Sequence, residues 1–375
     1  DILDQVQGIK LDTNIKHKLL LYLKSKNFNK ILILVGNKSK NIKVIKNYLH
    51  IIKKKFQTDI YIKKSSNPDY EEAFAVSRKI KCNNIEAIIA IGGGGIIDTA
   101  KLISAFQPYS KIETKDLILG KKIILKKLLP VIAVPTTAGT GSEVTHFAVV
   151  YYKNIKYSLA SKKLIPKAYF LDAKFIYTMP LYLSASTGFD ALSQAIESAW
   201  SISSTPKSRK YSYEAINIIN KHFINSLDNN KKFSKNQMMI ASHLSGKAIN
   251  ITKTTAPHAL SYKLASIAGI SHGHSVAITL GHFFEINYNS KKLSTGMTNT
   301  KLNRIMNEIF KNFGVNNAIS ARKKWFHLMK KCKLKSNIKK IKIKKNRELI
   351  ISSVNIERLR NHPIIIRKSQ FNKLF

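Results

Sequence analysis

The chain has 375 residues, 44% of them hydrophobic, and a formal net charge of +43 at pH 7. This length allows one large domain or two medium ones with separate cores, and no run approaches the roughly 18 apolar residues of a membrane-spanning helix. Cys82 and Cys332 form neither a metal-binding pair nor a disulfide framework. Since the first residues also lack a signal-peptide pattern, we expect a cytoplasmic protein without a membrane partner.

The positive charge has two explanations. Lysines and arginines could bind a nucleic acid or a membrane surface, or the lysines could reflect an A+T-rich genome, since Lys, Asn and Ile codons are A/T-rich. The lysines are spread along the whole chain, with the densest run at residues 330–347. No RNP, zinc-knuckle or helix-turn-helix signature accompanies them, so we expect no specific nucleic-acid partner.

The first half alternates buried strands with amphipathic helices. Apolar runs predict strands at "KILILVG" (30–36), "DIYIKK" (59–64), "IEAIIAI" (85–91) and "PVIAVP" (130–135). Helical spacing between them appears at 40–56 and 69–81. Alternating strands and helices predict a doubly wound parallel sheet, which we assign to an α/β domain over residues 1–178.

The second half changes character at "MPLYLSASTGFDALSQAIESAWS" (179–201), where apolar residues begin to recur at helical spacing. We expect an all-helical domain over residues 179–375. Within it, "LIISSV" (349–354) is an expected strand, and the lysine-rich segment 320–347 is an expected basic helix and loop.

Two strand ends carry phosphate-binding chemistry. In "AIGGGGIIDTAK" (90–101) four glycines follow a strand and open a helix, whose N-terminal N–H groups favour anions. The same turn also fits a tight strand–helix connection. A second strand end, "PTTAGTGSEVT" (135–145), is rich in hydroxyls and glycines. This differs from the G-x-G-x-x-G fingerprint, so we predict another kind of dinucleotide site, with the following contributors: Gly93, Gly94, Gly95, Asp98, Thr136, Thr137, Thr140 and Ser142.

The chain resembles the iron-containing, group III alcohol dehydrogenases. The motifs that carry the resemblance are "GGGGIIDTAK", "PTTAGTGSEVT", "KLIPKAYFLD", "STGFDALSQAIES" and "PHALSYKLASIAGISHGHSVAITL". The resemblance implies a Rossmann-like NAD(P)-binding domain and an all-α metal-binding domain in a dehydroquinate synthase-like fold. It also implies a homodimer that uses NADH or NADPH.

The turn after the first strand bears on the choice between NADH and NADPH. The tip after the first strand, "GNKS" (36–39), has no acidic residue to bind a ribose hydroxyl, as NAD-selective members of the family tend to have. Asn37 and Lys38 would not repel a 2′-phosphate, so we expect NADPH to be accepted, alongside NADH. Lys156 matches a family lysine near the cofactor.

The resemblance also implies one divalent metal ion, Fe²⁺ or Zn²⁺, held by Asp190, Gln194, His258 and His272. Asp190 and Gln194 have the i, i+4 spacing of one helix face. Gln194 stands where the family usually has His, and an amide oxygen is a poorer ligand than imidazole. Either it binds the metal weakly or it orients a water or substrate.

Proton transfer has two candidates. Tyr262 occupies a position where many family members have a His that relays protons, and His274 is the alternative relay. Either residue could equally be a packed polar side chain.

Within the family, "DALSQAIESAWS", "INITKTTAPHALSY", "HGHSVAITLGH" and "VNIERLRNHP" are similar to phosphonoacetaldehyde reductases. This implies reduction of phosphonoacetaldehyde to 2-hydroxyethylphosphonate in phosphonate biosynthesis. Two alternatives remain, a general alcohol or aldehyde dehydrogenase and a degenerate basic binding protein. A phosphonate would need cations and polar donors, for which the candidates are Lys253, Arg209, Lys247 and Asn250, with Lys207 as a further choice.

Overall fold

The computed structural model describes residues 14–65, 67–336, 347–352, 354, 359–366 and 371. The chain divides into two compact units. The first consists of Asp1–Thr137 and Ser142–Ile176, and the second consists of Ala138–Gly141 and Tyr177–Phe375.

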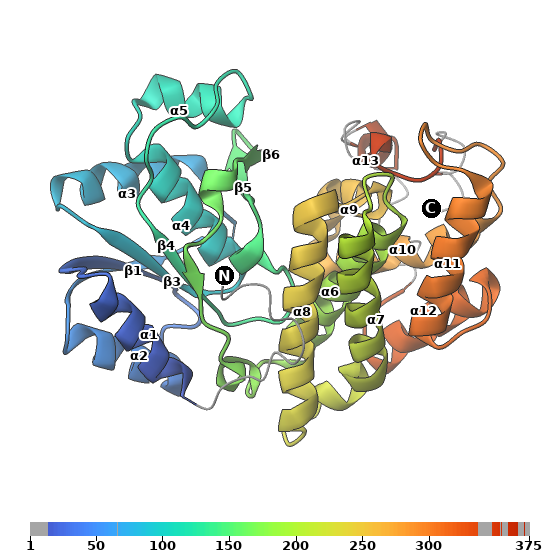
Figure 1. The fold of residues 1–375 in the computed structure, drawn as a ribbon, viewed down its shortest axis with the longest axis horizontal. Helices are drawn as coiled ribbons and strands as arrows, with labels where there is room; N and C mark the ends of the chain where they lie inside the picture. Colours follow the sequence, from blue (N-terminus) through green and yellow to red (C-terminus); the bar gives the residue numbers. More distant parts are fainter. Residues whose placement is uncertain are drawn as a thin grey trace. The chain divides into compact units, whose positions relative to one another are not determined.

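A five-stranded parallel sheet forms the centre of the first unit (Figure 1). Its strands are β1 (Lys30–Gly36), β2 (Gln57–Lys63), β3 (Ala87–Gly92), β4 (Val131–Pro135) and β7 (Ala168–Tyr169), in the order β2-β1-β3-β4-β7. Every residue of β3 and β4 is buried, as expected for strands covered on both faces.

Helices cover both faces of this sheet. Ile31, Ile33 and Val35 of β1 pack with α1 (Ile15–Ser25) and α2 (Lys43–Lys53), whereas Leu32 and Leu34 pack with α3 (Tyr70–Cys82) and α4 (Gly94–Phe106). This alternation follows from the two-residue period of a strand. The predicted parallel α/β architecture is confirmed.

The sequence had not predicted an antiparallel hairpin in the first unit, formed by β5 (Phe147–Tyr152) and β6 (Ile155–Ala160). Its two turn residues, Lys153 and Asn154, both have positive φ, as a two-residue hairpin turn requires. The remaining elements of this unit are α5 (Lys111–Ile118) and the 3₁₀ turns η1 (Ser142–Val144), η2 (Lys162–Leu164) and η3 (Ala173–Ile176).

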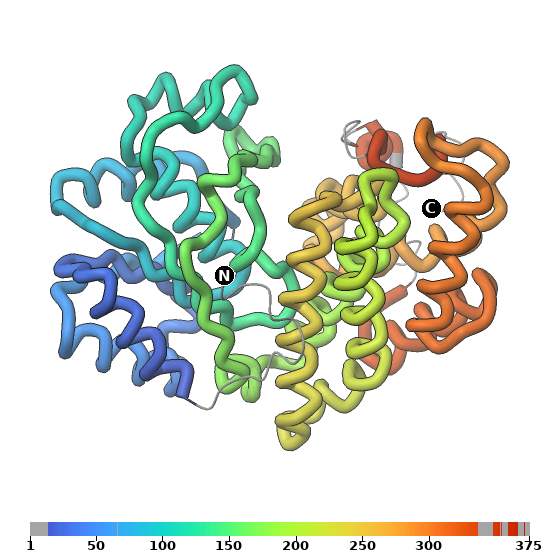
Figure 2. The backbone as a smooth tube through the Cα atoms, in the orientation of Figure 1, coloured from blue at the N-terminus to red at the C-terminus, as the bar shows by residue number. Residues whose placement is uncertain are grey.

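The second unit is built from helices, and its chain path can be followed in Figure 2. They are α6 (Leu181–Trp200), α7 (Pro206–Ser226), α8 (Lys232–Thr252), α9 (Ala256–Ala268), α10 (His272–Tyr288), α11 (Asn299–Phe313), α12 (Ala318–Lys331) and α13 (Arg347–Ser352). Phe189, Trp200, Phe284 and Trp325 form edge-to-face pairs in its core. None of the helices in the described ranges combines the length and the apolar character that a membrane span requires.

The expectation of a strand at 349–354 was wrong. Residues 349–352 belong to α13, where Ile350 is buried and Leu349 is 47% exposed. A single buried position per turn suits a short helix, and β-branched residues alone could not distinguish the two. In the lysine-rich segment, α12 ends at Lys331, and residues 337–346 lie outside the described residues.

Candidate metal and cofactor sites

Helix α6 presents three buried polar side chains along one face. Asp190, Gln194 and Glu197 are 3%, 4% and 0% exposed, and their spacing of four and three residues places them one above another. Buried carboxylates are costly unless they are paired or bind a cation. This face of α6 therefore requires partners from neighbouring helices.

Two histidines meet this face. His258 lies in the first turn of α9 and His272 is the first residue of α10. Ligand atoms of Asp190, His258 and His272 all lie within 4.8 Å of one another. The Oδ1 atom of Asp190 is 3.3 Å from Nε2 of His258 and 3.9 Å from Nε2 of His272.

Gly273 permits the close approach of α10 to α6. A Cβ atom at this position would lie 2.0 Å from the carbonyl oxygen of Ser186 and 2.9 Å from Cβ of Asp190. Any larger residue would push α10 away, and His272 would move with it. The glycine in "SHGHS" is therefore required for His272 to lie close to Asp190.

The side-chain oxygen of Gln194 is unpaired within the described part of the chain, which fits a role as a metal ligand. This Oε1 atom is buried and has no hydrogen-bond partner among the described residues. A buried polar atom left unpaired costs roughly 1–3 kcal/mol, so such an atom is a candidate ligand for a bound cation. One carboxylate, two imidazoles and one amide oxygen suit Fe²⁺ or Zn²⁺.

Access to this group is one-sided. The side chain of His272 is 37% exposed, whereas those of His258 and Asp190 are each 4% exposed. A partly open ligand set is what a catalytic metal site needs for a substrate to enter.

Glu197 orients His258, a role that the sequence had not revealed. Its carboxylate accepts hydrogen bonds from the Thr255 N–H and hydroxyl, both at 2.9 Å, from the His258 N–H at 3.3 Å, and from Nδ1 of His258. An Nδ1–H donated to Glu197 leaves Nε2 free to bind a metal. Burial opposes protonation of His258, but the charges and hydrogen bonds of Glu197 and Asp190 raise its pKa to about 9.

The two proton-relay candidates differ in their surroundings. The Tyr262 ring is stacked on His272, with ring centroids 5.5 Å apart and an interplanar angle of 10°. Nε2 of His274 instead donates to the Lys335 carbonyl at 2.8 Å, and its Nδ1 lies 3.2 Å from the Tyr182 hydroxyl. The geometry favours Tyr262 as the group beside the metal ligands, and it gives His274 a role in packing.

In the first unit, the glycine-rich turn lies at the carboxyl edge of the sheet. The strand order reverses between β1 and β3, and doubly wound sheets bind ligands at the carboxyl ends of strands beside such a reversal. β1 ends at Gly36, followed by the exposed Asn37 and Lys38, and β3 ends at Gly92. Gly93, Gly94 and Gly95 then open α4.

Close packing explains the first glycine of this turn. A Cβ atom on Gly92 would lie 2.4 Å from a side-chain carbon of Ile96. The Thr136 N–H donates to the Gly92 carbonyl at 3.0 Å, so the ends of β3 and β4 are joined. Thr137 lies against Gly93, which brings the two predicted cofactor motifs together within this unit.

Asp98 and Ser142, also predicted to bind the cofactor, form a buried internal network. Asp98 accepts from the Ser142 hydroxyl at 2.5 Å and from the Val149 N–H at 3.0 Å. Lys101 donates to Ser142 at 3.2 Å and to the Thr145 and Phe147 carbonyls at 2.9 and 3.0 Å. Burial raises the pKa of Asp98 against the charges of Lys101 and Lys156, and burial lowers the pKa of Lys101 to about 8.

These contacts hold the β5–β6 hairpin and η1 to α4. Lys156 lies in β6. Thr140, another predicted cofactor residue, belongs to the short segment assigned to the second unit.

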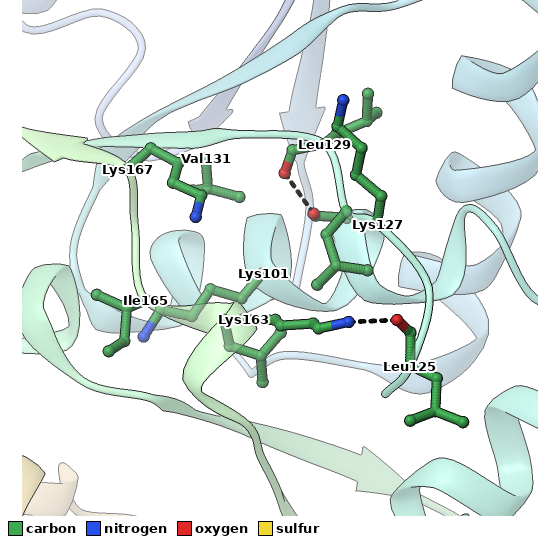
Figure 3. Close-up of a pocket in the computed structure, with 11 residues that line it drawn as sticks. Lys101, Leu125, Lys127, Leu129, Val131, Lys163, Ile165 and Lys167 are labelled. Carbon is green, nitrogen blue, oxygen red and sulfur yellow. Dashed lines mark hydrogen bonds between the residues drawn. The ribbon is translucent and has the colours of Figure 1, made fainter. Parts of the chain in front are cut away.

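A cavity of about 410 Å³ in the first unit lies elsewhere (Figure 3). Val131, the first residue of β4, and Lys167, just before β7, help to line it, so it is at the amino ends of these strands. Lys163 closes one side by donating to the Leu125 carbonyl (Figure 3). Because doubly wound sheets bind ligands at the opposite edge, we do not assign the cofactor to this cavity.

The predicted substrate residues lie on α7, α8 and the turns beside them. Arg209 donates from Nη1 to the Ser204 carbonyl and hydroxyl, at 3.2 and 3.0 Å. Lys247 lies over the Tyr211 ring at 5.6 Å. Asn250 is half-buried near the end of α8, and Lys207 is exposed.

Lys253 ends α8 with φ 60° and ψ −175°, a region that essentially only glycine occupies. Its backbone strain costs on the order of 1–3 kcal/mol.

Comparison with known proteins identifies the class. The family model "Iron-containing alcohol dehydrogenase" matches residues 12–173, and "Fe-containing alcohol dehydrogenase family, C-terminal" matches residues 184–374. The chain therefore belongs to the iron-containing alcohol dehydrogenase family.

Individual relatives include alcohol dehydrogenase 4 of Saccharomyces cerevisiae, 30% identical over 275 residues, which are 72% of each chain. Phosphonoacetaldehyde reductase of Streptomyces viridochromogenes is 30% identical over 222 residues, or 57% of this chain and 56% of that protein. Alcohol dehydrogenase 4 of Schizosaccharomyces pombe is 32% identical over 212 residues, and the match spans half of its length.

Among solved structures, sulfoacetaldehyde reductase of Bifidobacterium kashiwanohense in complex with NAD⁺ has a TM-score of 0.87 at 24% identity. The match covers 97% of this chain and 94% of that one. At this identity the likeness shows the fold, which confirms the predicted fold class.

Proposed function

We propose that this protein is a metal-dependent NAD(P)H oxidoreductase that reduces a small aldehyde to a primary alcohol. The observation that carries the proposal is the convergence of Asp190, His258 and His272, and the orphaned Oε1 of Gln194, one helical turn from Asp190, supports it. When bound there, a divalent cation would supply Lewis acidity toward a carbonyl oxygen. A reduced nicotinamide would supply the hydride.

The chain's own residues prepare this chemistry. Asp190 supplies negative charge to a buried position, and Glu197 holds His258 in the tautomer that presents Nε2. Tyr262, stacked on His272, restrains that ring and places a hydroxyl-bearing side chain on the more exposed side of the group. Its phenol is our candidate proton donor.

The cofactor half binds a dinucleotide at the carboxyl edge of its sheet in this proposal. The N-terminal turn of α4 offers backbone N–H groups to a diphosphate. Asn37 and Lys38 are exposed after β1 without an acidic neighbour, which supports acceptance of NADPH as well as NADH.

The substrate we propose is phosphonoacetaldehyde, which would become 2-hydroxyethylphosphonate. Support comes from the phosphonoacetaldehyde reductase among the relatives and from two cationic residues, Lys253 just before α9 and Arg209 in the first turn of α7. A charge-assisted hydrogen bond contributes about 1.5–3 kcal/mol, so two would favour the phosphonate over a neutral aldehyde by roughly 10²–10⁴ in kcat/KM.

The test is a steady-state assay of NADPH and NADH oxidation with phosphonoacetaldehyde and with propanal. A chelator should abolish both reactions, and Fe²⁺ or Zn²⁺ should restore them. Full activity of the metal-free protein would overturn the metal-dependent mechanism. Equal kcat/KM for the two aldehydes would leave the general dehydrogenase as the function.

A further inference from the structure

A buried asparagine near the C-terminus joins two turns, one that carries Lys253 and one whose Ser204 binds Arg209. Asn361 is 9% exposed, and it is more than a hundred residues away in sequence from the groups it binds. Its Oδ1 atom accepts from the hydroxyls of Ser201 and Ser203 at 2.8 and 2.9 Å. Its Nδ2 donates to the carbonyls of Thr252 and Thr254 at 2.7 and 3.1 Å.

The first of these turns holds Lys253 in its strained conformation. The two carbonyls that Asn361 binds flank Lys253 on either side. The Lys253 N–H donates to the Ile249 carbonyl at 2.8 Å, and the Thr252 hydroxyl lies 2.8 Å from the Lys253 carbonyl oxygen. These bonds offset the cost of a backbone region that lysine rarely occupies.

The same turn leads directly into the metal site. The N–H and hydroxyl of Thr255, two residues after Lys253, both donate to Glu197, the residue that orients His258. A displacement at 252–254 would therefore be felt by the turn that carries the lysine and by the start of α9.

The second turn, between α6 and α7, supports Arg209. The Ile202 N–H donates to the Asn361 carbonyl at 3.1 Å. Ser203 binds the Asn361 side chain, and the next residue, Ser204, accepts from the Arg209 guanidinium. One side chain thus fixes the turn of one cation and the turn that holds the other.

We infer that Asn361 is a positioning residue that sets the preference for an anionic substrate by holding the Lys253 and Arg209 turns in register. This inference rests on the proposed reduction of an anionic aldehyde. Strain at a non-glycine residue persists where the surroundings enforce it and commonly marks a functional site. Here the enforcement comes from the buried side chain of Asn361, which binds the carbonyls on both sides of Lys253.

The test compares kcat/KM for phosphonoacetaldehyde and for propanal in holoenzyme with the substitution Asn361→Leu, which keeps the size of the side chain but removes its hydrogen bonds. We expect the ratio of the two values to fall about tenfold or more, the lower range for one charge-assisted contact. The ratio is insensitive to the fraction of enzyme that is folded. Asn220→Leu is the matched control, because Asn220 binds Lys324 in the same unit and its loss should leave the ratio unchanged.

Two further variants connect the effect to the turns. Lys253→Gly should lower the ratio to a similar extent, and it should raise the Tm by roughly 2 °C because the backbone strain is relieved. In the double variant with Asn361→Leu, any further fall in the ratio should come only from the turn that binds Arg209. Ser203→Ala, at an exposed position, removes one bond of Asn361 and should lower the ratio by about twofold to fivefold.

The outcomes separate this inference from the function on which it rests. A wild-type ratio near one would refute the proposed substrate. A high wild-type ratio that survives both Asn361→Leu and Ser203→Ala would refute the positioning role and leave the substrate in place. If Asn361→Leu does not fold, the Ser203→Ala ratio decides.

Discussion

Two buried polar clusters in this protein differ in how completely their atoms are paired. In the first unit, Lys101 has four oxygen acceptors and Asp98 has two donors. In the second unit, ligand atoms of Asp190, His258 and His272 converge, and the unpaired Oε1 of Gln194 belongs to the next turn of the same helix. The first cluster is paired within the chain, whereas we propose that the second is completed by an added cation.

An unpaired buried atom does not by itself identify a metal site. His362 and Asn287 are also buried, and each has a side-chain nitrogen without a partner in the described part of the chain. No third ligating group joins them in the described ranges, where the one potential metal group is Asp190, His258 and His272. An unpaired atom indicates a metal site only where several ligands converge.

The largest effect should come from breaking the fully paired cluster of Asp98 and Lys101. Lys101→Met leaves Asp98 buried without its cation, and loss of one partner of a buried pair typically costs about 3–5 kcal/mol. Denaturant unfolding should show this loss, while the metal content of the folded protein stays unchanged. Lys162→Met, at an exposed position of the same unit, is the control. A stability equal to wild type would mean that Lys101 has a role other than structure.

Removing the hydrogen bond from His258 to Glu197 should have the next largest effect. Glu197→Gln retains the size of the side chain but replaces one acceptor of the His258 proton with a donor. Metal affinity, measured by competition with a chromophoric chelator, should fall by about 10–100-fold. Glu143→Gln, which changes another buried glutamate in the first unit, should not alter it. An unchanged affinity in Glu197→Gln would show that His258 needs no orienting partner.

Two substitutions of Gln194 should have smaller effects, and they should change metal binding in opposite directions. Gln194→Leu removes an unpaired buried oxygen, so the metal-free protein should gain roughly 1 kcal/mol of stability, and stabilisation by added metal should shrink. Gln194→His should instead strengthen metal binding, because imidazole is the better ligand. Thermal unfolding with and without Zn²⁺ measures both, with Gln237→Leu as control. Identical metal-induced Tm shifts in all variants would remove Gln194 from the ligand set.

His362 should make the free energy of unfolding depend on pH. Burial lowers its pKa to about 3 from the ordinary 6.5, so between these values the unfolded chain binds a proton that the folded chain does not. The free energy of unfolding should therefore fall as the pH falls from 6.5 toward 3, by at most about 1.4 kcal/mol per pH unit from this group.

His362→Phe should flatten this dependence, since the site already packs against Trp200 and Phe283. Denaturant titrations at several pH values measure the slope. The exposed His327→Phe should leave it as in wild type. If the His362→Phe slope equals that of wild type, the histidine binds its proton equally in the folded and unfolded states.

The sequence predicted the parts of this structure that depend on periodicity. Continuous apolar runs located β1, β3 and β4, and the i, i+4 spacing placed Asp190 and Gln194 on one face of α6. The positions of His258 and His272 came from family resemblance, and the structure brings both to Asp190.

What the sequence did not reveal depends on contacts between distant segments. Glu197 continues the same helix face as Asp190, but nothing local shows that it meets His258 from α9. The partners of Asp98 lie some 44 to 51 residues further along the chain. Asn361 binds turns 107 to 160 residues away, and no spacing rule covers such a separation.

We expect Asp190, Gln194, His258 and His272 to bind one divalent cation. Isothermal titration of chelator-treated protein with Zn²⁺ tests it most directly, with wild type and Asp190→Ala compared under the same conditions. We predict one tightly bound ion per chain in wild type and loss of that ion in Asp190→Ala. Equal stoichiometry and affinity in the two proteins would show that the metal, if one binds, is held elsewhere.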